Sequence, residues 1–325
     1  MSFIFATTAS RMGPSSLSRL ARATALAVLS VTLGLGLSAP ARADGRDTQA
    51  ATTDPREAEV ATAIKEAEAA QIKGPADITL RDQARLKLPA GYVWVPEPAA
   101  SKLMKAMGNR PDSRELGLIF PQQDDQHWMI VAEYEASGYI QDDDARNWNV
   151  DDLFKSLKEG TEAANEERRK LGHPELDIVG WVEKPHYSAD THRLVWSMSA
   201  RHKGDAADAP MSINYNTYAL GRDGYITLNL ITSLHDIPQD KAHAQTLLSA
   251  LDFSEGKRYA DFNSSTDKVA EYGLAALVGG VAAKKLGLFA MAAAFLAKFA
   301  KVFLLGGIAV LGGLTKFFKR DKPQA

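Results

Sequence analysis

The residues best suited to chemistry gather between positions 181 and 216, where aromatic and polar side chains recur along a run of expected strands. Aromatic rings with polar tips are typical of ligand grooves, but they also line ordinary sheets that a helix covers. Because every member falls within an expected strand or turn, we interpret the set first as structural and second as a candidate ligand or partner surface. The set comprises Trp181, His186, Tyr187, His192, Asn214, Tyr215 and Asn216.

Two of these residues, His186 and His192, have the side chain best suited to general acid–base catalysis near neutral pH. They flank the short segment Ser-Ala-Asp-Thr. An even-numbered hairpin turn would set Tyr187 opposite His192 and His186 opposite Arg193, with the two imidazoles on opposite faces of the sheet. We therefore do not expect the two histidines to share a metal ion, and a surface or packing role is favoured for both.

The sequence lacks the motifs of several large enzyme classes. It contains no Gly-x-Ser-x-Gly elbow, His-Glu-x-x-His zinc motif, P-loop or dinucleotide-binding glycine fingerprint. An EF-hand loop starting at Asp142 would need a glycine and a glutamate where Asn147 and Leu153 stand. The complete lack of cysteine excludes disulfides, thiolate metal sites and cysteine nucleophiles. We predict no catalytic residue, no metal ligand and no cofactor.

Composition and charge narrow the class of protein. The 325 residues contain 38 Lys plus Arg against 40 Asp plus Glu, a formal net charge of −2. This balance leaves no basic excess for a phosphate backbone, so we expect no nucleic-acid partner. With 45% hydrophobic and 24% charged residues, the chain is typical of a globular protein rather than a disordered one.

Residues 1–43 have the pattern of a secretory signal peptide. Two arginines precede an apolar run over residues 23–37, and a small-x-small site of Ala-Arg-Ala ends at Ala43. The apolar run is shorter than the roughly 20 residues of a membrane span. We predict cleavage after Ala43, so that the mature chain begins near Asp44. An uncleaved anchor is the alternative.

The mature chain is expected to begin with a tether and short helix over residues 44–73, followed by an exported domain over residues 74–265. Helical spacing, strand alternation and turn residues give the elements. The expected helices lie at 55–72, 99–107, 151–171 and 239–251, and the expected strands at 78–80, 86–88, 92–95, 116–120, 128–134, 177–181, 194–200, 213–220 and 225–231.

The order of these elements favours an α+β fold. The four strands between 177 and 231 follow one another through short turns, which is typical of an antiparallel β-meander sheet. Helices precede and follow the strands, so we expect flanking helices that cover one face of the sheet. Alternation over 128–134 predicts a half-buried strand with Trp128 and Tyr134 on the same face.

The region 266–318 has the composition of a helical membrane anchor. It lacks acidic residues from position 272 onward, and residues 302–315 form an uncharged run of about 21 Å as a helix. A lysine on either side of that run can snorkel and extend its usable length. The basic tail 319–325 should stay cytoplasmic under the positive-inside rule, which agrees with an exported domain before it. A single span and a helical hairpin both remain open.

Small residues form a stripe in the first part of that region, at the spacing of a 3.5-residue repeat. Such a stripe lets another helix approach closely, either residues 302–315 folded back or the same segment of a second copy. The alternative explanation is the segment's general richness in small residues. The stripe consists of Gly273, Ala276, Gly280, Ala283, Gly287, Ala290, Ala294 and Ala297.

Several longer segments carry a family resemblance. They include Gly-Tyr-Val-Trp-Val-Pro at 91–96, Gly-Tyr-Ile-Gln-Asp-Asp at 138–143, Thr-His-Arg-Leu-Val-Trp at 191–196 and Asn-Tyr-Asn-Thr at 214–217. On these motifs the chain resembles the membrane-anchored bacterial proteins grouped as domain-of-unknown-function family 2167. The resemblance implies an exported domain with a C-terminal membrane segment and supplies no catalytic residue. It also implies, more weakly, a fold similar to the small α+β domains of Mog1 and PsbP.

These observations predict a bacterial inner-membrane protein whose main domain lies in the periplasm and whose C-terminus is cytoplasmic. The leading hypothesis is a non-enzymatic binding or interaction module for an unknown envelope protein or ligand, with homo-oligomers through the C-terminal helices. The alternative is an envelope hydrolase or transferase with His186 or His192 as general base. A deep pocket with a carboxylate beside His192 would favour the enzyme, and a flat or shallow sheet face would favour binding.

Overall fold

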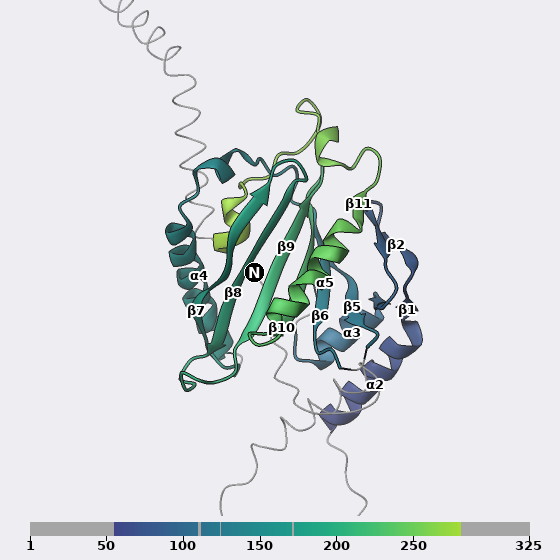
Figure 1. The fold of residues 1–325 in the computed structure, drawn as a ribbon, viewed down its shortest axis with the longest axis vertical. Helices are drawn as coiled ribbons and strands as arrows, with labels where there is room; N and C mark the ends of the chain where they lie inside the picture. Colours follow the sequence, from purple (N-terminus) through teal and green to yellow (C-terminus); the bar gives the residue numbers. More distant parts are fainter. Residues whose placement is uncertain (1–54, 110–111, 124, 171, 281–325) are drawn as a thin grey trace, which may run out of the picture. The chain divides into compact units, whose positions relative to one another are not determined.

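The computed structural model describes residues 55–280 except 110–111, 124 and 171. The expected signal peptide, most of the tether, and everything beyond residue 280 lie outside the described residues. The described chain forms two compact units, the first with residues 55–140 and 161–271 and the second with 141–160 and 272–280. Most of the secondary structure belongs to the first unit (Figure 1).

An eight-stranded antiparallel sheet is the main element of the first unit (Figure 1). Its strands, in sheet order, are β1 (Ile72–Lys73), β4 (Tyr92–Pro96), β5 (Glu115–Pro121), β6 (Met129–Glu135), β10 (Tyr225–Ser233), β9 (Ser212–Leu220), β8 (Arg193–His202) and β7 (Leu176–Ser188). Two meanders build the sheet, β4 to β6 and β7 to β10, and they join where β10 pairs with β6. The second meander confirms the antiparallel arrangement expected between residues 177 and 231.

A smaller sheet has three strands in the order β11 (Leu251–Phe253), β3 (Ala84–Leu88) and β2 (Ala76–Leu80). Strand β3 alternates strictly, with Leu86 and Leu88 buried and Arg85 and Lys87 exposed. Since successive side chains of a strand point to opposite faces, this sheet has one apolar face. That face packs into the same hydrophobic cluster as the large sheet.

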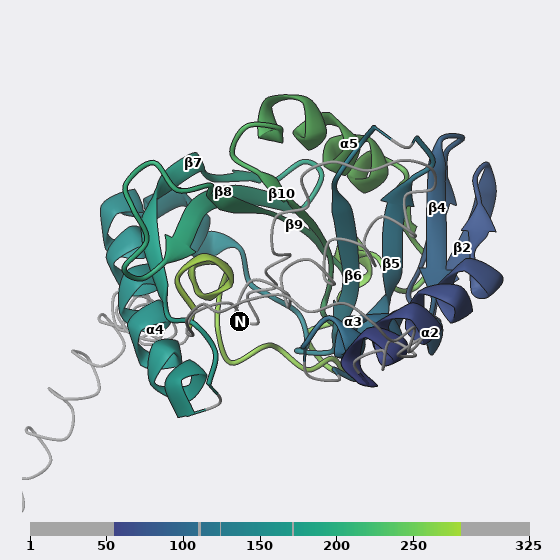
Figure 2. The ribbon, with the colours of Figure 1, turned by 90° about the horizontal axis from the view of Figure 1, so that it is seen from below.

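The helices are α2 (Pro55–Ala70), α3 (Ala99–Ala106), α4 (Val150–Lys170) and α5 (Ile237–Ser249). Figure 2 shows α5 on one face of the large sheet, here called the α5 face, with α2 and α3 on the opposite α2/α3 face. One hydrophobic cluster joins Leu247 of α5 to the first face, and another joins Ile64 and Leu103 to the second. The expectation of one covered face was therefore wrong. The strands of the first meander carry apolar side chains on both faces, and both faces need cover.

Strand β6 shows this difference directly. Ile130 and Ala132 belong to the cluster on the α5 face, whereas Met129 and Val131 belong to the cluster on the α2/α3 face. The strand is thus buried on both sides rather than half-buried, because its intervening residues are apolar too. Trp128 and Tyr134 do share a face, as the alternation predicted.

The second unit includes a short 3₁₀ segment, η1 (Asp143–Asn147), and a helical stretch over residues 275–280. The Asp144 carboxylate accepts hydrogen bonds from the backbone amides of Leu274, at 3.2 Å, and Ala275, at 3.0 Å. These contacts satisfy two of the amides that a helix leaves unpaired at its start. Within residues 55–280, no helix is long and apolar enough to cross a membrane.

Candidate functional site

A cavity of about 430 Å³ lies beside the end of β2, strand β4 and the beginning of β5, all in the first unit. Leu80, Trp94 and Leu116 give it apolar walls, and Arg81, Glu97 and Glu115 bring charge to it. A concave site with mostly apolar walls and a few polar groups is the usual form of a small-molecule site. This cavity is therefore the candidate functional site.

A β-bulge at the start of β5 positions the acidic wall. Glu115 pairs with Glu133 of β6, but Gly117 pairs with Ala132, so Leu116 is an extra residue without a partner in the ladder. A bulge bends its strand and changes where the side chains point. As a result, two consecutive residues, Glu115 and Leu116, both line the cavity.

Glu115 is the unusual group of the site. Its side chain is almost fully buried, with 4% of its surface exposed, and Oε1 has no hydrogen-bond partner within the described structure. Burial raises the pKa of the Glu115 carboxyl to about 7, and the negative charge of Glu97 adds to the increase. An unpaired carboxylate is costly in such a place, so the group is partly protonated near neutral pH.

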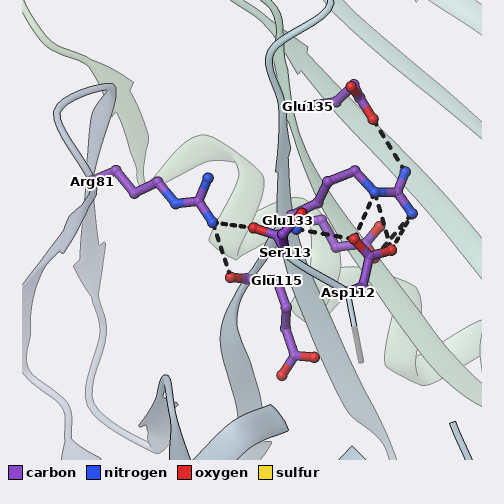
Figure 3. Close-up of polar contacts among 7 residues, drawn as sticks. Arg81, Asp112, Ser113, Glu115, Glu133 and Glu135 are labelled. Carbon is purple, nitrogen blue, oxygen red and sulfur yellow. Dashed lines mark hydrogen bonds and ion pairs between the residues drawn. The ribbon is translucent and has the colours of Figure 1, made fainter. Parts of the chain in front are cut away.

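Arg81 contacts the backbone of Glu115 but forms no ion pair with its carboxyl within the described structure. The residue follows β2 with a φ of 53°, in the left-handed region, and its guanidinium donates hydrogen bonds to the backbone carbonyls of Ser113 and Glu115. The same guanidinium lies 6.0 Å from the ring centre of Tyr134. Figure 3 shows the carboxyl of Glu115 directed away from these contacts. Arg81 thus fixes the backbone at the start of β5 and leaves the acid unpaired.

The neighbouring carboxylates, in contrast, have a cation. Arg114 forms ion pairs with Asp112, with Glu133 at 3.9 Å and with Glu135 at 3.3 Å (Figure 3). These acids raise the pKa of Arg114, and Arg114 in turn lowers the pKa of Asp112. Burial still raises the pKa of Glu133. The Arg114 cluster, defined by these four residues, thus shares one cation among three carboxylates.

Trp94 on β4 can form a wall of the cavity because its ring packs against a glycine, Gly117, on the neighbouring strand β5. A Cβ added to Gly117 would lie 2.4 Å from the Trp94 ring and 2.6 Å from the carbonyl oxygen of Val95. Only glycine lets the indole lie this close to the neighbouring strand. The cavity wall therefore depends on Gly117 as well as on Trp94.

The seven residues expected as a ligand or partner surface are distributed over both faces of the large sheet. Tyr215 is fully buried on the α5 face, where its hydroxyl lies 3.3 Å from both Glu183 and Gln245. Its sequence neighbours Asn214 and Asn216 point to the opposite face and are 9% and 6% exposed. The structure therefore does not gather these three residues on one open surface.

The remaining four lie on the β7–β8 hairpin. Trp181 packs edge-to-face against the fully buried Trp196, with ring centres 6.0 Å apart. Nδ1 of His192 lies 3.1 Å from the Tyr187 hydroxyl, and its ring stacks on Tyr259 with centres 4.0 Å apart. These contacts are typical of side chains that hold a hairpin in place.

The expected register of this hairpin was wrong by two residues. Tyr187 pairs with Leu194, and His186 pairs with Val195. The reason is the turn, which spans residues 189–192 and includes His192 itself with a φ of 52°. Although they are not cross-strand partners, Tyr187 and His192 still meet through their side chains.

Only three members of the small-residue stripe fall within the described residues: Gly273, Ala276 and Gly280. A Cβ at Gly273 would lie 2.5 Å from the Asp144 carboxylate. The close approach of Asp144 therefore explains why a glycine is needed here, without a partner helix. Gly280 has a φ of 70°, which is not the conformation of a helix interior. The other five, Ala283, Gly287, Ala290, Ala294 and Ala297, lie outside the described residues.

Sequence reasoning missed all the charged residues of the cavity: Arg81, Glu97 and Glu115. One signal was available, because Glu115 directly precedes the apolar run Leu-Gly-Leu-Ile-Phe. Charge next to an apolar strand usually marks the strand's exposed end, and the expected strand accordingly began at residue 116. Only the bulge and the adjacent small sheet make Glu115 a buried residue.

The fold defines a mixed α+β protein with a single large antiparallel sheet and helices on both faces. Within that class, the chain belongs to the family described as "Protein of unknown function (DUF2167)", which it matches over residues 72–309. This confirms the family that the sequence motifs indicated. No curated protein matches the chain.

Two solved structures are similar in fold. The solution structure of cyanobacterial PsbP (CyanoP) from Synechocystis sp. PCC 6803 has 12% identity and a TM-score of 0.32, with 57% of this chain and 91% of that chain covered. A structure of a point mutant of the protein Mog1 has 12% identity and a TM-score of 0.29, with 55% and 94% covered. Both are of the kinds that the resemblance implied, and at these scores neither bears on function.

Proposed function

We propose that this chain is a membrane-anchored protein of the bacterial cell envelope and that its exported domain is a non-enzymatic binding module. The membrane topology rests on the sequence at the two ends: a signal-peptide pattern before Asp44 and an apolar, acid-free region followed by a basic tail. The binding role rests on one observation, the cavity with an unpaired, buried Glu115.

Binding requires fewer functional groups in the cavity than catalysis does. Binding needs a shaped space and a group that the ligand can complement, and the cavity provides both. Catalysis needs in addition a nucleophile or base held within reach of an orienting group. Arg81 is engaged with backbone carbonyls, and among the described residues the cavity lining includes no histidine or lysine that could act with Glu115. The site therefore supports recognition better than turnover.

The second candidate is an envelope hydrolase or transferase with a histidine as general base. One observation favours it, the 3.1 Å contact between His192 Nδ1 and the Tyr187 hydroxyl. The ring of His192 is also stacked on Tyr259, an arrangement that restrains an imidazole rather than presenting it to a substrate. We place this candidate second for that reason.

Cysteine labelling tests the proposed topology, because the chain has no cysteine of its own. Asp205→Cys places a thiol in an exposed turn of the first unit, and Pro323→Cys places one in the basic tail. In cells whose outer membrane has been removed, an impermeant maleimide should label position 205 at once and position 323 only after lysis. Labelling of 323 in unlysed cells would refute a cytoplasmic C-terminus.

A plug in the cavity tests the binding role. Ser113 is exposed and lines the cavity, so Ser113→Trp should fill the entrance without disturbing the core. Ser264→Trp is the matched control, an exposed serine that is not part of the cavity lining. Small molecules extracted from the envelope should raise the Tm of the wild type and the control but not of Ser113→Trp. Equal shifts for all three, or none, would contradict the proposal.

A further inference from the structure

We propose that the cavity takes a small organic cation, whose ammonium or guanidinium group pairs with the carboxylates of Glu97 and Glu115. This inference rests on the proposed function, in which the cavity is the binding site, and adds the chemical class of the ligand. Three observations carry it: the local balance of charge, the size of the space and the chemistry of its walls.

The first observation is that negative charge remains uncompensated at the cavity. Arg114 forms its ion pairs with Asp112, Glu133 and Glu135. Arg81 donates to two backbone carbonyls instead of to an acid. Within the described structure neither Glu97 nor Glu115 has an ion pair.

The Ser101 hydroxyl interacts with both of these acids. It donates a hydrogen bond to Glu97 and lowers the pKa of Glu115 against the larger effect of burial, which raises it, while Oε1 of Glu115 has no hydrogen-bond partner among the described residues. A buried acceptor without a donor is costly, and a ligand that brings an N–H would remove that cost. The cavity therefore lacks one positively charged donor.

The second observation is the volume of about 430 Å³, which exceeds what one ion requires and suits a molecule of several heavy atoms. The third is the apolar lining of Leu80, Trp94 and Leu116. A divalent ion would need several oxygen ligands around it, whereas an organic cation can pair its charged end with carboxylates and bury its carbon skeleton. The indole of Trp94 also attracts cations through its ring face.

The ionisation of Glu115 couples such binding to pH. The charged groups around it are Glu97 after β4, Glu133 on β6, Arg81 after β2, and Asp112 and Arg114 near its own strand. With the pKa of Glu115 at about 7, a cation must replace a proton in much of the population at neutral pH. Binding should release protons and weaken by up to about tenfold per pH unit below pH 7.

Calorimetry on the full mature chain in detergent tests the inference with benzylammonium as probe and benzyl alcohol as its neutral counterpart. At pH 8 the wild type should bind benzylammonium and not benzyl alcohol. Glu115→Gln keeps the shape of the side chain and removes its charge, so affinity should fall by about tenfold or more. Glu135→Gln is the matched control, because Glu135 pairs with Arg114 and is not part of the cavity lining.

The outcomes separate this inference from the proposed function. If benzyl alcohol binds as well as benzylammonium and Glu115→Gln has no effect, the cavity binds ligands but not cations, and this inference alone is overturned. Binding of Ca²⁺ or Mg²⁺ that depends on Glu115, without benzylammonium binding, also overturns it. If neither these probes nor the envelope extract bind to the wild type, both proposals fail. Proton release on benzylammonium binding, measured in two buffers, would support the pairing with Glu115.

Discussion

Glu115 begins a strand whose other side chains are apolar; it lines the cavity, and Oε1 of its buried carboxyl has no hydrogen-bond partner among the described residues. The expected strand over residues 116–120 left Glu115 outside it. The burial of Glu115 depends on the bulge at Leu116 and the position of the small sheet, and its raised pKa depends also on the nearby Glu97; one-dimensional patterns contain none of these. Sequence reasoning therefore found the strand and missed the residue that makes the site.

The raised pKa of Glu115 predicts a pH-dependent stability. The carboxyl has a pKa of about 7 in the folded chain against a reference of 4.5, so the folded state holds a proton that the unfolded state has lost between these values. The free energy of unfolding should thus fall as pH rises from about 4.5 to 7, by about 3 kcal/mol in total. Glu115→Gln has no such proton, so its free energy of unfolding should increase relative to that of the wild type as the pH rises over this range.

Urea denaturation of the wild type, Glu115→Gln and Glu135→Gln at pH 5 and pH 8 measures this effect. Glu115→Gln should be close to neutral at pH 5 and stabilising at pH 8, and Glu135→Gln should follow the wild type more closely. A wild type and Glu115→Gln that differ by the same amount at both pH values would show that the Glu115 carboxyl is not buried as described.

At the scale of elements, alternation and turn residues located the helices and most strands within a few residues, but β7 continues to Ser188, seven residues beyond its expected end at 181. Strands of two and three residues, β1 and β11, escaped because so short a run has no period to detect. The pairing of β6 with β10 also escaped, since it joins segments about 90 residues apart and is decided by the packing of both faces. Local sequence patterns thus predicted the individual strands and helices, whereas tertiary contacts determined the order of the strands in the sheet.

The close approach of β4 and β5 predicts a sharp response to Gly117→Ala. The new methyl group would lie 2.4 Å from the Trp94 ring, so the indole must shift and the cavity wall must change. Overpacking of this kind typically costs about 1–3 kcal/mol. Both the free energy of unfolding and ligand-dependent Tm shifts should fall.

Gly160→Ala is the matched control for that substitution. Gly160 lies inside α4, where an added Cβ would meet nothing within 4 Å. Replacing an open helical glycine by alanine should stabilise the chain by about 0.5–1 kcal/mol. If the two substitutions changed stability equally, the packing of Trp94 on Gly117 would be disproved.

The cap formed by Asp144 gives a prediction for the start of the 275–280 helix. Asp144→Ala would leave the amides of Leu274 and Ala275 without their acceptor, at a cost of about 1–2 kcal/mol. Hydrogen exchange of these two amides should become about tenfold faster or more, whereas Asp143→Ala, at an exposed neighbour, should leave it unchanged. Unaltered exchange in Asp144→Ala would mean that the carboxylate does not cap this helix.

At the scale of the whole molecule, the proposed location is supported by the two ends of the sequence, and the proposed function is supported by the described domain. These are separate inferences. The signal-peptide pattern and the basic tail concern residues outside 55–280, and the small-residue stripe remains a prediction for its five members beyond Gly280. The described domain adds a cavity that contains a buried glutamate, and the proposed binding role depends on that cavity.

Processing of the N-terminus can be read from the mass of the mature protein. The small-x-small pattern predicts that the chain extracted from membranes begins at or near Asp44. Intact-mass spectrometry would show this directly, and Ala43→Leu, which removes a small residue from the site, should slow cleavage. A protein that retains its first residues would instead support the uncleaved anchor.

Both proposals require Glu115 to be a buried carboxyl without a neighbouring cation, and the titration of Glu115 itself measures this. Carbon-13 NMR of carboxyl-labelled glutamate, with Glu115→Gln for assignment, would follow the single resonance from pH 4 to pH 9. We predict a midpoint near 7 for the ligand-free protein and a lower midpoint once benzylammonium is bound. A midpoint near 4.5 that benzylammonium does not move would show a solvated carboxyl and contradict the account.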